Sequence, residues 1–309
     1  MAGEFRGKVA IVTGGGSGIG EALCRELARR GAQVIVADIN ASDADRVAAI
    51  ITGDGGTATA RAADVTREQD VKGLVQHAVS AHGRLDYLFS NAGIAIGGEA
   101  QYLTLDHWRR VLDVDLYGVL HGVVAAYPVM VRQGFGHIVN TSSSAAFFPV
   151  PANAPYATAK HAVLGMSLGL RIEAADLGVK VSCVCPGFVR TNIFQNSLSV
   201  NPHVPDDAPL EELAGAPSRM MPAARAAEII LDGVARNRAL IVFPASIRLA
   251  RHVHDLFPPL LESEVLRQFR RRKRKIAAAL ESGDHLSALT ARQRADHRGL
   301  AVAPDGQPQ

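Results

Sequence analysis

The chain has little cysteine: only Cys24, Cys183 and Cys185 occur among 309 residues. Three thiols are too few for a disulfide framework, and no spacing of cysteine and histidine resembles a zinc site. Each cysteine lies in an apolar stretch. We therefore expect buried free thiols, a reducing compartment and no bound metal.

The sequence also has no recognisable leader and lacks long apolar runs. The N-terminal MAGEFRGKVAIV carries Glu4 and passes directly into an apolar stretch, unlike a signal peptide. We judge no run of about 18 residues to be apolar enough to span a bilayer. No repeat with a period of roughly 20–50 residues is visible. These absences favour a cytoplasmic protein.

Net charge is small but unevenly distributed. The formal net charge is +3, and residues 245–309 hold 12 Lys or Arg against 7 Asp or Glu, whereas residues 1–244 are slightly acidic. This balance gives no reason to expect nucleic-acid binding. The basic run at residues 270–275 is most simply a solvated helix face, and weak contact with a membrane surface or another polyanion is the alternative.

Strand-like and helix-like stretches alternate along the chain. With 48% apolar residues the chain can bury a large core, and one domain (1–244) with a basic, partly helical extension (245–309) fits this length better than two domains. We expect the end of the extension to be disordered. The alternation predicts an α/β fold with a doubly wound parallel sheet of about seven strands, of the Rossmann type. The predicted strands are residues 9–12, 34–37, 57–62, 85–89, 136–141, 179–185 and 239–243, and the longest predicted helix is 104–131.

The fold is organised around residues 9–38. An apolar run leads into a glycine-rich turn at residues 14–20, a helix follows, and a second apolar run stops at Asp38. Backbone N–H groups at such a turn can approach a pyrophosphate at a helix N-terminus, because glycine has no Cβ. Asp38 lies eighteen residues after Gly20, near the spacing at which a carboxylate binds the adenosine ribose and repels a 2′-phosphate. The stretch predicts a dinucleotide site that favours NAD over NADP; glycines that only form a tight turn are the alternative.

The spacing Thr13-Gly14-x-x-x-Gly18-Ile19-Gly20 resembles the short-chain dehydrogenase/reductase family. Four later motifs resemble the same family in the same order, so that the resemblance covers about residues 5–243. For Asp64, which the resemblance places near the adenine, the alternative is a local cap of the next helix. The resemblance implies that the cofactor is bound by Thr13, Gly14, Ser17, Gly18, Ile19, Gly20, Asp38, Asp64, Val65, Asn91, Ala92, Gly93, Tyr156, Lys160, Pro186, Gly187, Val189 and Thr191.

Ser143, Tyr156 and Lys160 match the family's catalytic residues, because Ser143 lies thirteen residues before Tyr156 and Lys160 four after it. Hydride transfer from an alcohol needs a group that takes the hydroxyl proton. Tyrosine titrates near about 10, and a lysine one helical turn away lowers that pKa. The resemblance implies Tyr156 as general acid or base, Lys160 as the nearby charge and a ligand of the nicotinamide ribose, and Ser143 as a ligand of the substrate oxygen.

Asp115 departs from the family pattern. It stands where the family has an asparagine as its fourth catalytic residue, which is linked to the lysine through a water. An amide both donates and accepts hydrogen bonds, whereas an ionised carboxylate only accepts. Asp115 therefore either alters the proton relay from Lys160 or is a tolerated substitution.

Several apolar side chains follow the predicted catalytic motifs. The irregular stretch at residues 191–221, which holds four prolines, fits a substrate lid. Few basic residues lie on these segments, which favours an apolar alcohol or ketone of steroid-, terpenoid-, retinoid- or aryl-like type. The candidates for the substrate pocket are Phe147, Phe148, Phe188 and Phe194, and the alternative is that these aromatic residues belong to the core.

Together these features predict an NAD-dependent oxidoreductase that interconverts a secondary alcohol and a ketone. The family resemblance suggests a homodimer or homotetramer formed through the long helices. The competing hypothesis is a non-catalytic dinucleotide-binding sensor or scaffold that is tethered by its basic tail. The presence of Ser143, Tyr156 and Lys160 favours the enzyme.

Overall fold

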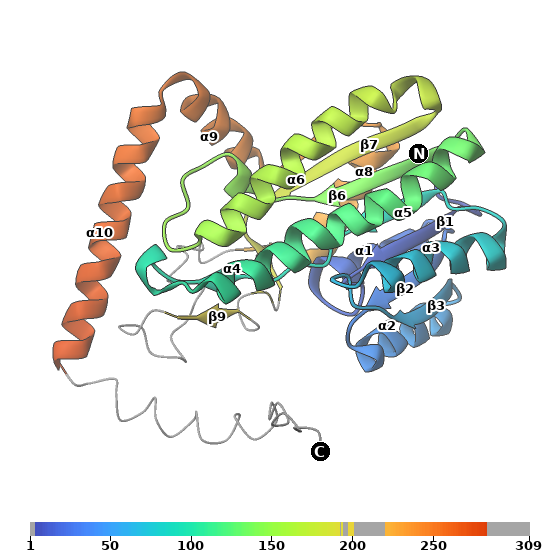
Figure 1. Ribbon diagram of the computed structural model, residues 1–309, viewed down its shortest axis with the longest axis horizontal. Coiled ribbons are helices and arrows are strands. Elements are labelled where there is room, and N and C mark those ends of the chain that lie inside the picture. Colours follow the sequence, from blue (N-terminus) through green and yellow to red (C-terminus); the bar gives the residue numbers. More distant parts are fainter. Residues whose placement is uncertain (1–3, 192, 194–196, 201–219, 283–309) are drawn as a thin grey trace, which may run out of the picture.

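The structure, a computed structural model, describes residues 4–191, 193, 197–200 and 220–282 (Figure 1). Seven parallel strands form one sheet in the order β11-β7-β6-β4-β1-β2-β3, which confirms the predicted doubly wound fold. The strands are β1 Val9–Thr13, β2 Gln33–Asp38, β3 Thr57–Ala62, β4 Tyr87–Ser90, β6 Gly136–Thr141, β7 Val179–Pro186 and β11 Leu240–Phe243.

Helices cover both faces of this sheet (Figure 1). The first face packs against α1 (Gly18–Arg29), α2 (Ala41–Gly53) and α8 (Ala223–Ala235), whose apolar residues form one buried cluster with alternate residues of the strands. A second cluster lies on the opposite face, under α3 (Glu68–His82), α5 (Gly118–Gln133) and α6 (Ala154–Glu173). Central strands covered on both faces must be apolar throughout, which explains the continuous apolar runs.

The order of the strands reverses between β1 and β4. From β1 the chain proceeds outward to β2 and β3, then returns through α3 to β4 on the other side of β1. Ligands of open α/β sheets bind at the carboxyl ends of strands where this reversal occurs. The fold therefore places a crevice beside Thr13 at the end of β1 and Ser90 at the end of β4.

Strand β4 begins two residues later than predicted, at Tyr87 rather than Leu85. The side chain of Gln133 accepts a hydrogen bond from Leu85 N and donates one to Leu85 O, both at 2.9 Å. Since these backbone groups are used by a side chain, Leu85 does not extend the strand ladder.

The long helix predicted at 104–131 is interrupted. It consists of α4 (Leu105–Leu112), a π-helical turn (Asp113–Tyr117) and α5, with Thr104 as the N-cap residue of α4. A π-turn widens the backbone locally and is frequent at functional sites; this one carries the fully buried Asp115.

Among the described residues, one helical span is long and apolar enough to cross a membrane by length and composition, Leu105–Gln133. The expectation that no such run exists was therefore wrong. In the fold, this span packs Ala126 and Met130 of α5 into the buried cluster on the sheet, so the same composition also suits a core helix.

Short elements and two C-terminal helices complete the described fold. Strand β5 (Ile96–Gly97) pairs with β9 (Leu198–Ser199), and β8 (Val189–Arg190) pairs with β10 (Met221–Pro222). The 3₁₀-helices are η1 (Ala100–Tyr102), η3 (Ser144–Ala146) and η4 (Ala175–Leu177), and the extension forms α9 (Ala245–Leu256) and α10 (Pro258–Ser282). The expected disordered end lies outside the described residues, as does most of the predicted lid at 191–221.

Candidate active site

The glycine-rich turn between β1 and α1 is fixed by close backbone packing. A Cβ on Gly20 would lie 1.9 Å from Gly14 O, and Gly14 and Gly18 have φ of +64° and +55°. Only glycine meets both requirements at low cost. A Cβ on Gly18 would lie 3.1 Å from the Cβ of Thr191, so the turn directly contacts the segment that follows β7.

That segment leaves β7 at Pro186. Gly187 N donates to Phe243 O at 2.7 Å, and the buried Val189 pairs with Met221. These backbone contacts hold the segment against the glycine-rich turn. They place Thr191 beside Gly18 and bring together two motifs that are remote in sequence.

The ends of β1 and β4 are held together by side-chain contacts. The Nδ2 of Asn91 donates to Thr13 O at 3.1 Å and so braces the ends of the two strands. Thr13 Oγ1 accepts from Asn91 N at 3.0 Å and from Ala92 N at 3.2 Å. The crevice edge is thereby fixed on both strands.

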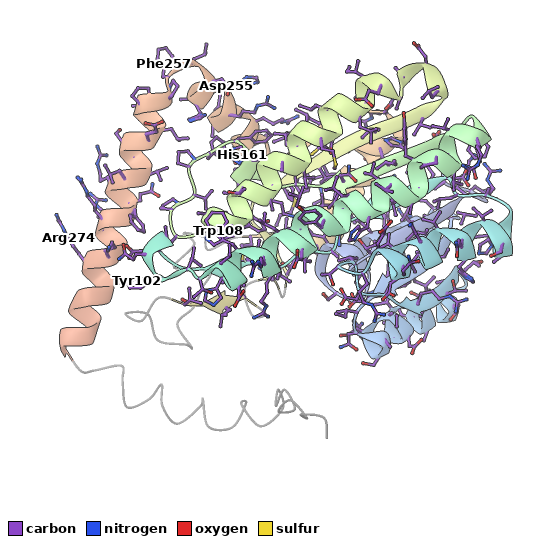
Figure 2. All side chains as sticks on the ribbon, viewed as in Figure 1. Tyr102, Trp108, His161, Asp255, Phe257 and Arg274 are labelled. Atoms are coloured by element: carbon purple, nitrogen blue, oxygen red, sulfur yellow. The ribbon has the colours of Figure 1, made fainter. Side chains whose placement is uncertain are left out.

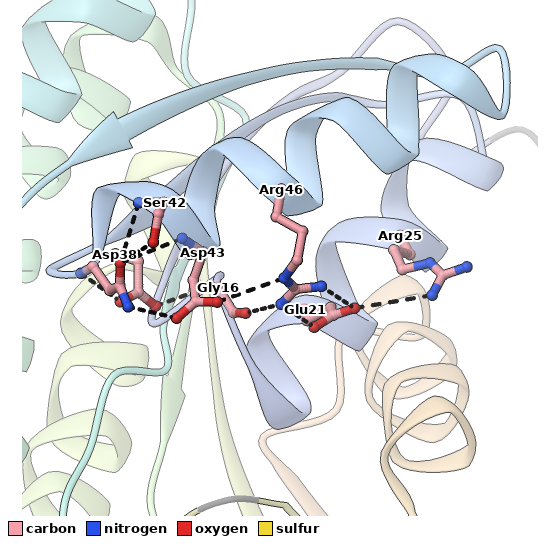
Figure 3. A network of polar contacts seen from close by, with 8 residues as sticks. Gly16, Glu21, Arg25, Asp38, Ser42, Asp43 and Arg46 are labelled. Atoms are coloured by element: carbon pink, nitrogen blue, oxygen red, sulfur yellow. Dashed lines mark hydrogen bonds and ion pairs between the residues drawn. The ribbon is translucent and has the colours of Figure 1, made fainter. Parts of the chain in front are cut away.

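Asp38 is oriented by the backbone at the end of β2 (Figure 3). Its Oδ2 accepts from Gly16 N at 2.9 Å and its Oδ1 from Asn40 N at 3.0 Å. Arg46 donates to Gly16 O at 2.7 Å and forms an ion pair with Glu21 at 2.9 Å. Sequence reasoning missed Arg46 and Glu21, because they lie on two different helices and belong to no motif.

The residues near the turn fit a dinucleotide. Ser17 is the N-cap residue of α1, but its side chain makes no capping hydrogen bond, and helix N-termini bind phosphate groups. Ser17, Gly18, Asp38 and Thr191 line an open hollow of about 1020 Å³ together with residues of α2 and α8. This hollow can take the phosphate and ribose end of the cofactor; none of Ser143, Tyr156, Lys160 and Asp115 lines it.

Asp64 is used locally. Its Oδ1 accepts from Thr66 N at 2.9 Å and from Thr66 Oγ1 at 2.8 Å, so the carboxylate stabilises the turn before α3. Helix α3 itself begins at Glu68, with Arg67 as its N-cap residue. Asp64 therefore does not cap this helix but stabilises the turn that precedes it. Val65 is buried, and its carbonyl is 2.9 Å from His121 Nδ1.

The catalytic candidates converge at the carboxyl ends of β4 and β6. Lys160 Nζ lies 3.0 Å from Asp115 Oδ2 and donates to Thr141 O at 3.1 Å. Asp115 Oδ1 accepts from Ile94 N at 2.8 Å. The expectation of a water between Asp115 and Lys160 is therefore corrected, because the π-turn brings the carboxylate into direct contact with the ammonium. A Cβ at Gly93 would lie 3.2 Å from Asp115 Oδ2, so a larger residue there would press against the carboxylate.

Tyr156 lies beside Lys160, whose Nζ is 5.3 Å from the centre of the phenol ring. Burial raises the pKa of Tyr156, and the Asp115 charge acts in the same direction. The Lys160 charge and a hydrogen bond with Ser143 lower that pKa, but they do not outweigh burial. A lowered pKa was expected from Lys160 alone; desolvation and the carboxylate, which the expectation did not include, reverse the net direction.

The two charged partners also affect each other. Burial raises the pKa of Asp115, although Lys160 opposes this shift. Burial disfavours the charged form of Lys160, but Asp115 and Tyr156 outweigh it, so that the pKa of Lys160 is raised. Lys160 is therefore held as an ammonium, which is the form that can stabilise a phenolate.

The serines after β6 divide their roles. Ser143 is buried, and its Oγ accepts from Ala145 N at 3.2 Å. The neighbouring Ser142 donates to Lys160 O at 2.7 Å and so anchors α6, a role that the sequence did not reveal. Serine hydroxyls occur in many loops, so the only sign of this role in the sequence was that Ser142 lies next to Ser143.

Three of the four aromatic candidates for the substrate pocket lie among the described residues, and the pocket itself stays a prediction. Phe147 and Phe148 are half-buried, and both contact helix α9 of the extension. Phe188 is half-buried, and Phe194 lies outside the described residues. Phe147 and Phe148 therefore belong to a surface shared with the extension.

Comparison with known proteins agrees with this geometry. The family model for short chain dehydrogenases matches residues 8–201. A cyclohexanol dehydrogenase of Acinetobacter sp. (strain SE19) is 39% identical over 197 residues, which are 63% of this chain and 78% of that protein. A mitochondrial borneol dehydrogenase of Lavandula x intermedia is 39% identical over 192 residues, 61% of this chain and 71% of that protein.

A solved structure has the same fold. The short-chain dehydrogenase/reductase from Burkholderia phymatum, in complex with NAD, superimposes with a TM-score of 0.75 and 29% identity, covering 83% of this chain and 96% of that chain. Its bound NAD agrees with the fit of the glycine-rich turn to a nicotinamide dinucleotide. The chain is therefore an oxidoreductase of CH–OH groups, and it belongs to the short-chain dehydrogenase family.

Proposed function

We propose that this chain interconverts an apolar secondary alcohol and its ketone, with NAD as the hydride acceptor and Tyr156 as general acid or base. The observation that carries the proposal is the cluster at the ends of β4 and β6. There the Lys160 ammonium lies 5.3 Å from the centre of the Tyr156 ring and 3.0 Å from Asp115. Such a cluster can hold and move a proton in a water-poor site.

During oxidation, the phenolate form of Tyr156 takes the proton of the substrate hydroxyl and becomes the neutral phenol. Ser143 binds the same substrate oxygen and stabilises the charge that develops on it. Lys160 stays protonated and stabilises the phenolate form of Tyr156. The dinucleotide, when bound, accepts the hydride that leaves the substrate carbon. Reduction of a ketone uses the same groups in reverse.

NAD is the proposed cofactor because Asp38, Asp43 and Glu21 line the ribose end of the site. Arg46, which also lines it, is already paired with Glu21 at 2.9 Å and with Asp43 at 3.5 Å. A 2′-phosphate dianion at Asp38 would therefore meet several carboxylates, and Arg46 would have to leave its partners to bind it.

The substrate is proposed to be a cyclic or otherwise apolar alcohol. Two relatives are named for cyclohexanol and borneol, which are an alicyclic and a bicyclic alcohol. The half-buried Phe147, Phe148 and Phe188 follow the catalytic strands and favour an apolar ligand.

We further propose a homodimer or homotetramer that forms through the long helical span 105–133, where Tyr117 of the π-turn is 50% exposed and Val124 of α5 is 56% exposed. We also propose that the protein is cytoplasmic.

The basic run at residues 270–275 of α10 is proposed to make at most a weak contact with anionic lipid, because surface charges attract such lipids only over short distances.

A screen of secondary alcohols with NAD and with NADP, followed by the absorbance of the reduced nicotinamide, tests the proposed function. The proposal expects turnover of cyclohexanol or borneol with NAD. The alternative of a non-catalytic sensor or scaffold is not favoured, since Ser143, Tyr156 and Lys160 are present and converge. Binding of NADH without turnover of any alcohol or ketone would support it and contradict the proposal.

A further inference from the structure

Two loops follow β4 and β6, the strands at whose carboxyl ends the catalytic cluster lies. The β4 loop (residues 94–104) begins after Gly93, and the β6 loop (residues 144–153) begins after Ser143. They contact each other, because Gly98 N donates to Ala152 O at 2.8 Å. Ala152 has φ of +59°, a backbone conformation that is uncommon outside glycine and that surrounding contacts must maintain.

Helix α9 packs against the β6 loop. The guanidinium of Arg251 lies 4.4 Å from the centre of the Phe147 ring, and the His254 ring meets Phe148 edge-on with 5.9 Å between ring centres. Phe147 and Phe148, two of the four aromatic candidates for the substrate pocket, are therefore held by the extension.

Helix α10 reaches the β4 loop (Figure 1). Lys273 Nζ lies 2.8 Å from Glu99 Oε2, and the Glu99 side chain is only 15% exposed. On the same helix, Leu261, Val265 and Phe269 recur at every fourth position and are all partly buried, so they share one face. Arg274 points away from the body (Figure 2).

We propose that α9 and α10 form a bracket that fixes the β4 loop relative to the β6 loop and thereby selects the substrate. The bracket acts on the proposed alcohol site, so this inference rests on the proposed function. It makes Lys273, Glu99 and Arg251 positioning residues for substrate choice, without contact to the reacting atoms. The ligand class stays an apolar alcohol, and the bracket limits how bulky that alcohol can be.

The ion pair of the bracket is open to solvent on one side, because the Lys273 side chain is 51% exposed and that of Glu99 15%. An ion pair of this kind contributes at most about 1 kcal/mol, or about a fivefold change in a population. Losing it therefore loosens the β4 loop without unfolding the sheet. The size preference changes through KM, because the catalytic cluster and the glycine-rich turn are separate from these contacts.

The test uses the full chain with Lys273→Glu, Glu99→Lys, the double charge swap, and Arg270→Glu as control. Arg270 is exposed on α10 and makes no ion pair within the described part of the chain, so its variant changes the same charge without touching the bracket. Hydrogen–deuterium exchange of residues 94–104 needs no substrate. The expected result is about fivefold faster exchange in both single variants, with wild-type exchange in the double swap and in the control.

The second measurement is KM against kcat for cyclohexanol and for the bulkier borneol with NAD. The proposal expects the ratio of the two KM values to change about fivefold in the single variants and to return in the swap, while kcat and NADH affinity stay constant. Equal exchange in all proteins would overturn the bracket. Altered exchange with an unchanged KM ratio would overturn substrate selection. If no alcohol is turned over by wild type, the proposed function fails while the exchange result still decides the bracket.

Discussion

The glycine-rich turn and the bracket of α9 and α10 both fix segments at the carboxyl ends of the strands, but they are built differently. Around Gly14, Gly18 and Gly20, backbone atoms pack so closely that side chains are excluded. Around Glu99 and Phe147, solvent-accessible side chains hold loops to the extension, and Phe257 at the corner between the two helices is 62% exposed (Figure 2).

This difference separates two tasks. A turn fixed by backbone sterics binds one invariant ligand part, the phosphates, and tolerates almost no change. Loops fixed by partly exposed side-chain contacts can be altered at a cost of about 1 kcal/mol or less. We therefore expect cofactor binding to depend on the first region and substrate choice on the second.

The largest expected effect comes from Gly20→Ala. Its Cβ would lie 1.9 Å from Gly14 O, so the turn must open. We expect loss of NADH binding and an unfolding free energy lower by about 3 kcal/mol. Fluorescence titration with NADH and urea unfolding measure both.

Gly73→Ala is the matched control, because nothing lies within 4 Å of its Cβ in the middle of α3. This variant should bind NADH normally and gain up to about 1 kcal/mol, since alanine favours a helix over glycine. Normal NADH binding by Gly20→Ala would break the distinction between the two regions.

Asp38→Asn should change cofactor choice. The carboxylate charge that is proposed to favour a ribose hydroxyl and repel a 2′-phosphate is removed, and hydrogen bonds to charged groups contribute about 1.5–3 kcal/mol. The ratio of kcat/KM for NAD to that for NADP should fall about tenfold or more. Asp43→Asn removes a nearby charge and should change this ratio less. A wild-type preference for NADP would contradict the assignment.

Asp115→Asn should shift the pH dependence of alcohol oxidation. Burial raises the pKa of Tyr156 and the Asp115 charge raises it further, and oxidation needs the basic form, which accumulates as pH rises through this pKa. Removing the charge lowers the pKa, so the alkaline-side rise in kcat/KM should move to lower pH. The exposed Asp113→Asn is the control. Superimposable profiles of Asp115→Asn and wild type would make Asp115 a bystander.

The smallest expected effect concerns anionic lipid. Full-length protein should be retained weakly by anionic liposomes at low salt and released as the ionic strength rises, because surface charges are screened. Cosedimentation measures it, and Arg270→Glu combined with Arg274→Glu should reduce it. Protein that ignores such liposomes at low salt would contradict a lipid contact.

Local features of the sequence were sufficient for much of the fold and the turn. Apolar runs that alternate with helical stretches predict the seven strands. Gly14, Gly18 and Gly20 predict the turn because only glycine fits its positive φ angles and close backbone contact, and all three lie within seven positions of the sequence. The spacing of Tyr156 and Lys160 is likewise local, because four residues make about one helical turn.

Contacts between distant residues could not be predicted in this way. The Lys160–Asp115 ion pair depends on a π-turn that no propensity indicated. Lys273 and Glu99 are 174 positions apart, and their contact depends on where α10 docks. Phe147 and Phe148 read as pocket residues because their apolar character is visible in the sequence, whereas their partners on α9 are not.

The most direct test of the account measures turnover and NADH affinity together in Tyr156→Phe, with the half-exposed Tyr117→Phe as control. The phenyl ring keeps the packing around Lys160 but removes the hydroxyl that carries the proton. We predict that Tyr156→Phe turns over a secondary alcohol roughly 10²-fold or more slowly than wild type, while its NADH dissociation constant is almost unchanged. The control, Tyr117→Phe, should behave like wild type in both measurements. Turnover of Tyr156→Phe close to that of wild type would contradict the role of Tyr156 as general acid or base.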